Sequence, residues 1–171
     1  IPTGSYFGPT SIHTLTVFNN KMWLIGGLEG SSFSNAIWNT SDGINWTQVT
    51  VSGSLFTPRY SHQTFVLNNK IFVVGGYNNA VGILNDVWSS TDGTTWIEEN
   101  NTNAFTNRYY HNCIVNNSKV YLICGNVSNE MWTSTDGISW TEITQSNNYI
   151  SQRRGQSSVL PVSYTHLRAH E

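Results

Sequence analysis

Short apolar stretches recur along the chain at a fixed interval and are separated by polar turn residues. Three segments, HTLTVFNNKMWLIGG, HQTFVLNNKIFVVGG and HNCIVNNSKVYLICG, align without a gap, and their first residues, His13, His62 and His111, are 49 positions apart. Three further segments align in the same way, IWNTSDGINWTQV, VWSSTDGTTWIEE and MWTSTDGISWTEI. Self-similarity at a period of about 20–50 residues is typical of repeat architectures. The chain is therefore organised as consecutive copies of one structural unit.

Each repeat predicts four short strands. The first two flank a two-residue turn at Asn19-Asn20, Asn68-Asn69 or Asn117-Ser118, where asparagine tolerates the positive φ that such a turn requires. The second strand is apolar and ends in a glycine pair, which indicates close backbone approach. The third and fourth strands carry one tryptophan each and are joined through an Asp-Gly turn. We expect a three-residue loop with a left-handed glycine there, because that length places both tryptophans on one buried face.

Four-stranded units at this period predict an all-β fold, a β-propeller in which each blade covers the apolar face of its neighbour. We expect blades at residues 1–50, 51–99 and 100–145, and the first strand of a fourth at 146–161, so that the chain is part of a larger ring. The remaining blades of the same chain would then cover the outer faces. Residues 162–171, VSYTHLRAHE, break the repeat and match a translated sequencing adapter, so we interpret them as a non-native tail.

The repeat resembles the kelch family and the central domain of the galactose-oxidase type. The residues that carry the resemblance are Arg59, His62, Lys70, Gly75-Gly76, Asn85-Asp86-Val87-Trp88 and Trp96. It covers about residues 5–160 and departs from the pattern at Thr10, in place of arginine, and at Cys124, in place of glycine. The resemblance implies a propeller and admits both binding proteins and enzymes, including relatives of sialic-acid epimerases, sialidases and copper-radical oxidases.

The charge and the cysteines of the chain limit the classes of partner and the cellular location that we expect. Charged residues make up 11% of the chain and the net charge is -2, with no basic run, so we expect no nucleic acid partner. No apolar run is long enough for a membrane span. Low charge and an Asn-, Ser- and Thr-rich composition favour a secreted or cell-surface bacterial protein. The hairpin register places Cys113 opposite Leu122 and Cys124 opposite His111, a diagonal arrangement that favours free thiols over a disulfide.

The candidate binding surface is the end of the blades at which the repeat varies in length. From the second position of the glycine pair to the next tryptophan the spacing is 11, 12 and 7 residues, starting at Gly27, Gly76 and Gly125. Variable loops on a rigid scaffold often carry specificity, although loops also drift in length without function. Arginine and tyrosine anchor interfaces most often. We therefore predict ligand contacts from the arginines and tyrosines of this end: Arg59, Tyr60, Tyr77, Arg108, Tyr109, Tyr110 and Arg153.

The sequence offers little chemistry for catalysis. The three repeated histidines have no second ligand type beside them, which favours a structural hydrogen bond over a metal site, and we expect no cofactor. Neither a nucleophile elbow nor a phosphate-binding loop is present, and no paired acid and base stand out. The function predicted is a non-enzymatic binding module with a protein or glycan partner. A fragment of a propeller enzyme and a structural spacer of a surface protein are the alternatives.

Overall fold

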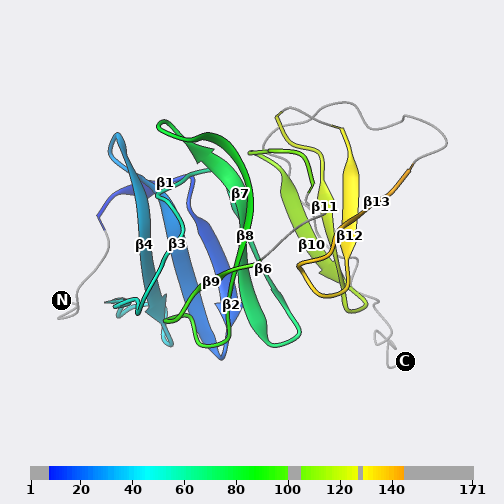
Figure 1. The fold of residues 1–171 in the computed structure, drawn as a ribbon. Coiled ribbons are helices and arrows are strands. Elements are labelled where there is room, and N and C mark those ends of the chain that lie inside the picture. The colour runs from blue at the N-terminus through cyan, green and yellow to red at the C-terminus, as the bar shows by residue number, and fades with distance from the viewer. Residues whose placement is uncertain (1–7, 100–104, 127–128, 145–171) are drawn as a thin grey trace, which may run out of the picture.

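A computed structural model of the chain describes residues 8–99, 105–126 and 129–144. Every regular element within these ranges is a β-strand, and the strands form three antiparallel sheets that stand side by side (Figure 1). The predicted all-β fold with three four-stranded blades is confirmed. The predicted start of a fourth blade and the tail at 162–171 lie outside the described residues.

Each blade follows the chain order of its strands. Blade 1 contains β1 (Thr10–Ser11), β2 (Thr14–Phe18), β3 (Lys21–Glu29), β4 (Ser32–Thr40) and β5 (Thr47–Gln48). Blade 2 contains β6 (Gln63–Leu67), β7 (Lys70–Asn78), β8 (Gly82–Ser90) and β9 (Ile97–Glu98). Blade 3 contains β10 (Asn112–Asn116), β11 (Lys119–Ile123), β12 (Met131–Ser134) and β13 (Thr141–Glu142). The short β1 was not predicted; it pairs with the end of β3 and adds a fifth strand to the first sheet.

The first hairpin turn of each blade has the predicted length and conformation. Leu67 pairs with Lys70, which leaves Asn68 and Asn69 as the two turn residues, with φ of 50° and 59°. The turns of blades 1 and 3 repeat this geometry. All three lie at the lower end of the sheets in Figure 1, which we call the turn end. The opposite end, where β3 meets β4 and β7 meets β8, we call the loop end.

The Asp-Gly turn is longer than predicted. In blade 2 the last paired residues are Ser89 and Ile97, so residues 90–96 lie between them. The reason is that side chains take over the hydrogen bonds of the turn: Asp92 Oδ1 accepts the backbone N–H groups of Thr94 and Thr95, at 2.7 and 2.8 Å. Because the Asp92 side chain already accepts these backbone N–H groups, the turn is stable without additional hydrogen bonds between the two strands. Gly93 has the left-handed conformation that the sequence predicted, with φ of 79°.

Both tryptophans of a blade nevertheless share one face, because the number of intervening residues is odd. Trp88 and Trp96 of blade 2 pack in one core with Trp23 and Ile25 of blade 1. Trp132 and Trp140 of blade 3 pack in the same way against blade 2. The predicted burial of the tryptophan face between neighbouring sheets is therefore confirmed for blades 2 and 3.

The tryptophan face of blade 1 has no sheet packed on it among the residues that the structure describes. Leu15 and Val17 on this face are 57% and 69% exposed. Their equivalents in the next blades, such as Val66 and Val115, are partly buried against the two cores. The outer face of blade 1 thus has the composition of an inter-blade face without a covering blade.

The repeated histidines and glycine pairs pack against each other across blades. A Cβ atom on Gly26 would lie 2.8 Å from His62 Cε1, and one on Gly75 would lie 2.9 Å from His111 Cε1. The close approach of the next blade's histidine excludes a side chain at both positions, which also have positive φ, 61° and 55°. His62 Nε2 lies 3.1 Å from Thr14 Oγ1 of blade 1, a structural hydrogen bond of the kind that the sequence predicted. The predicted repetition in every blade is not seen at His111, whose ring nitrogens have no hydrogen-bond partner among the described residues.

Cys113 has the predicted register, directly opposite Leu122, whereas Cys124 follows the end of β11 at Ile123 and has no ladder partner. Both thiols are free; Cys124 is buried and Cys113 is half-buried. Burial raises the pKa of the Cys113 thiol well above its usual range. In the described part of the chain there is no helix of the length and apolarity that crossing a membrane requires.

Candidate functional site

Five aromatic side chains from two neighbouring blades and the segment that begins the third gather at the loop end. Four of them are tyrosines whose rings form a closed circuit, with centroids 5.6 Å apart for Tyr60 and Tyr77, 5.5 Å for Tyr77 and Tyr109, 5.1 Å for Tyr109 and Tyr110, and 6.3 Å for Tyr110 and Tyr60. Phe33 joins them at 5.4 Å from Tyr60 and 6.3 Å from Tyr77. All five side chains are half-buried. We call this set the aromatic cluster.

Two members of the cluster stand on strands and not on flexible loops. β3 and β7 bulge at the glycine pairs and then continue to Glu29 and Asn78, whereas β11 already ends at Ile123. The variable spacing in the sequence thus reflects strand extension in blades 1 and 2. Phe33 pairs with Leu28, and Tyr77 pairs with Ile83, on these extensions. Strand pairing thus fixes the backbone from which both rings project.

Tyr60 is held by the buried residue that precedes it. The Arg59 side chain is 0% exposed, and its guanidinium donates to both carboxylate oxygens of Asp86 at 2.6 and 2.7 Å and to the carbonyl of Gly75 at 2.9 Å. The Arg59 backbone N–H donates to Ser34 O of blade 1 at 3.0 Å. Arg59 thus joins blades 1 and 2. Tyr60 itself exchanges two backbone hydrogen bonds with Tyr77, at 3.0 and 3.2 Å.

Arg108 positions Tyr109 and Tyr110 in the same way one blade further along. Its side chain is 0% exposed and donates to Glu130 Oε2 at 2.9 Å and to Cys124 O at 3.0 Å. Its backbone N–H donates to Leu84 O of blade 2 at 2.9 Å. Burial lowers the pKa of the Arg108 guanidinium, against the opposing effect of Glu130. Burial alone would raise the pKa of Glu130, but hydrogen bonds from Trp132, Thr106 and Arg108 bring it below its usual value.

The structure separates the residues that the sequence grouped. The predicted tyrosines, Tyr60, Tyr77, Tyr109 and Tyr110, lie together at the surface. Arg59 and Arg108 are interior residues with a structural role, and they offer nothing to a ligand at the surface, because their donors are engaged by carboxylates and carbonyls. Arg153 lies outside the described residues. Phe33 was missed; the available signal was an aromatic residue inside the variable span of blade 1.

The cluster combines half-buried rings with phenol hydroxyl groups. Among the described residues, no hydrogen-bond partner contacts any of the four phenol hydroxyls. Burial raises the pKa of Tyr60, and the neighbouring Tyr110, Tyr109 and Tyr77 raise it further. The Tyr60 phenol therefore stays neutral and able to donate and accept hydrogen bonds at physiological pH.

Comparison with known proteins agrees with this architecture. A family model described as the KLHDC2/KLHL20/DRC7 Kelch-repeats domain matches residues 12–166. The chain belongs to the kelch-repeat family. No curated protein matches it in sequence. The kelch match spans all three blades, and a domain of this kind indicates a protein-interaction module.

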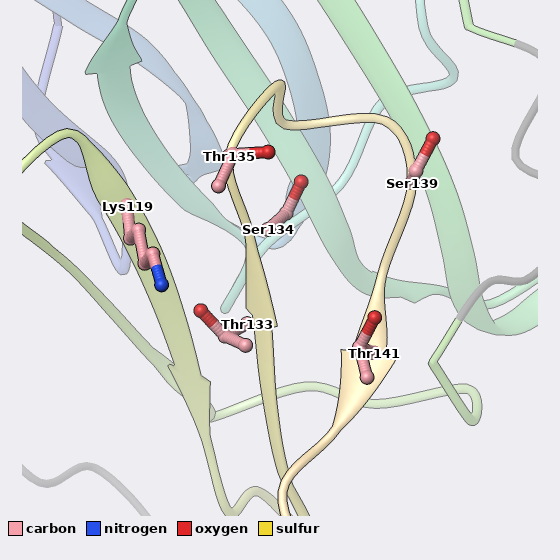
Figure 2. Close-up of a pocket in the computed structure, with 6 residues that line it drawn as sticks. All are labelled: Lys119, Thr133, Ser134, Thr135, Ser139 and Thr141. Atoms are coloured by element: carbon pink, nitrogen blue, oxygen red, sulfur yellow. The ribbon is translucent and has the colours of Figure 1, made fainter.

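A second feature of the kelch domain is a hollow at the turn end of blade 3. It has a volume of about 340 Å³ and is lined by Lys119, Thr133, Ser134, Thr135, Ser139 and Thr141 (Figure 2). Lys119 and Thr133 alternate with Val120 and Trp132, which face blade 2, so the hollow opens on the far face of the sheet. A fourth blade would pack on that face in the predicted ring. We therefore assign the hollow no ligand.

Metal binding finds no support in the described residues, where no group of three or more His, Cys, Asp or Glu side chains is arranged to hold an ion. The aromatic cluster is the feature of the kelch domain that combines a rigid frame, exposed ring surface and uncommitted polar groups. It is the candidate binding surface.

Proposed function

We propose that this kelch domain is a non-enzymatic binding module whose partner docks on the aromatic cluster at the loop end. The observation that carries the proposal is the closed circuit of four tyrosines, with hydroxyls that have no partner among the described residues. Tyrosine is enriched at interface hot spots, because it provides a large amphipathic contact area at a low cost in side-chain entropy.

The repeat pattern supports a functional role for the cluster. Residues that serve the fold recur in every blade, as Phe56 and Phe105 do in the two cores. Tyr77 has no aromatic counterpart, since the equivalent positions hold Leu28 and Asn126. Tyr110 likewise corresponds to Ile12 and Ser61. Tyr60 and Tyr109, by contrast, occupy equivalent positions of consecutive blades. It is Tyr77 and Tyr110, which depart from the repeat, that favour recognition over folding.

A protein is the partner class that the kelch match favours. A glycan is the second candidate, because tyrosine faces and free hydroxyls also suit the C–H faces and hydroxyls of a sugar ring. We also propose that the module acts at the cell surface or outside the cell, as its low charge and Asn-, Ser- and Thr-rich composition suggest. The enzyme-fragment and spacer alternatives remain distinct from this proposal, because they require residues beyond the described blades.

The test compares a cluster variant with a matched variant at the turn end. The full chain, the double variant Tyr77→Ser/Tyr109→Ser and the control Lys21→Gln would be immobilised and exposed to an envelope-protein extract and to a glycan array. We expect wild type and Lys21→Gln to retain the same partner at equal levels and the double variant to lose it. Equal retention by the double variant, with its fold intact by circular dichroism, would remove the cluster from the binding surface.

A further inference from the structure

We propose that the aromatic cluster receives a basic side chain, an arginine or a lysine, from a protein partner. This inference rests on the proposed function and names the chemistry of the partner. It follows from how the described part of the chain distributes its own charges and from the gathering of aromatic rings at the loop end.

The cations in the described part of the chain lie away from the surface of the loop end. Among the described residues, Lys21, Lys70 and Lys119 each follow a hairpin turn at the turn end. Arg59 and Arg108 have side chains that are 0% exposed and paired with carboxylates. The part of the loop end that the structure describes therefore offers no exposed cation to an acidic partner.

The carboxylates of the loop end remain partly accessible. The side chains of Asp86 and Glu130 are 21% and 29% exposed, although both are paired with buried arginines. Glu29, at the tip of blade 1, is exposed. Among the described residues, the surface charge around the cluster is thus neutral to negative, which disfavours an acidic partner and favours a cationic one.

The rings themselves attract a cation. The face of an aromatic ring carries negative charge density, and a guanidinium or ammonium within about 6 Å of the ring centre is attracted to it. The chain already uses this contact inside the fold, where the guanidinium carbons of Arg59 and Arg108 lie 5.4 Å from the ring centres of Phe56 and Phe105. At the cluster, phenol oxygens can also accept N–H groups from the same side chain.

The test uses a defined probe in place of the unidentified partner. A randomised heptapeptide library would be selected on the full chain, and the best binder would be titrated against wild type, Tyr77→Phe and Tyr77→Leu. The phenylalanine variant keeps the ring face, whereas leucine keeps apolar volume and removes the ring. We expect selected peptides to be enriched in Arg or Lys, with binding weakened about threefold to tenfold by Tyr77→Leu and less than twofold by Tyr77→Phe.

The outcomes separate this inference from the proposed function. Peptides that bind through the cluster but are not enriched in Arg or Lys would overturn the basic side chain and leave the binding module standing. Equal weakening by Phe and Leu would also overturn it, because the hydroxyl and not the ring face would then carry the contact. A library that yields no binder, together with a glycan-array signal lost in Tyr77→Ser/Tyr109→Ser, would overturn the protein partner itself.

Discussion

Arg59 and Asp86, 27 positions apart in the sequence, form a bidentate ion pair with N–O distances of 2.6 and 2.7 Å. The arginine side chain in this pair is fully buried. Arg108 and Glu130 occupy the same positions in blade 3. Blade 1 has neither partner, since Thr10 and Ala36 stand in their places. The pair is therefore present or absent as a unit, which explains the departure at Thr10.

Removing one partner of this ion pair should lower the free energy of unfolding far more than removing both partners together. Asp86→Ala leaves the Arg59 charge buried without compensation, and we expect a loss of about 3–5 kcal/mol in the free energy of unfolding. The double variant Arg59→Thr/Asp86→Ala, which copies blade 1, should lose less than Asp86→Ala alone. Urea denaturation of the three proteins measures this. A double variant at least as unstable as the single one would show that the pair does not act as a unit.

The Asp-Gly turn should be intolerant of a side chain for a packing reason. A Cβ atom on Gly93 would lie 2.2 Å from the Trp23 ring of blade 1, whereas one on Gly30 would meet nothing within 4 Å. Both glycines have positive φ, 79° and 62°. We expect Gly30→Ala to lower the free energy of unfolding by about 1 kcal/mol, because of backbone strain. Gly93→Ala should lower it by about 1–3 kcal/mol more, because the added methyl group overpacks the contact with Trp23. Thermal denaturation compares them, and equal costs would contradict the blade contact.

Stability should fall as the pH drops from 7 towards 4. Burial, with a smaller effect from the nearby arginines, lowers the pKa of His62 and His111 to about 3, so both are neutral in the folded protein. In the unfolded chain they bind protons below about pH 6.5, so their contribution is complete above that pH and is lost as the pH falls towards 3.

Between pH 7 and pH 5, each of these histidines should lower the free energy of unfolding by up to about 2 kcal/mol. The urea midpoint at a series of pH values measures the slope, and His62→Gln should reduce it by about half. An unchanged slope in that variant would mean that other groups govern the acid sensitivity.

The uncovered face of blade 1 should make the chain associate when it is expressed alone as residues 1–161. Leu15 and Val17 are exposed where equivalent residues elsewhere pack against a neighbouring blade. We expect oligomers or aggregates by light scattering, and a larger monomer fraction for Leu15→Ser/Val17→Ser. A monomeric wild type that melts cooperatively would contradict this expectation.

Much of the fold could be predicted from the sequence, because each local sequence pattern occurs in all three repeats. The two-residue turns, the left-handed glycine at position 93 and the shared tryptophan face all follow from residue type and periodicity. The length of the Asp-Gly turn did not follow, because the side chain of Asp92 replaces ladder hydrogen bonds with its own. The strand extension in blades 1 and 2 was interpreted as loop variation for a similar reason, since spacing alone does not distinguish the two.

Only part of the candidate site could be predicted from the sequence. The four tyrosines chosen from the variable end do lie together and half-buried there, and their role as ligand contacts stays a prediction. The arginines were selected by the same residue-type rule, yet both point inward to carboxylates that lie more than twenty positions away. Such a pairing depends on how β7, β8, β11 and β12 stack, which residue type does not reveal. Phe33 joins the cluster from β4 of blade 1, where it contacts Tyr60 and Tyr77 of the next blade.

Hydroxyl-radical footprinting of the full chain with its captured partner tests the central claim most directly. The account predicts reduced modification of Tyr60, Tyr77, Tyr109 and Tyr110 in the complex and unchanged modification at Met22, near the turn end. Protection at the turn end with unchanged tyrosines would contradict it.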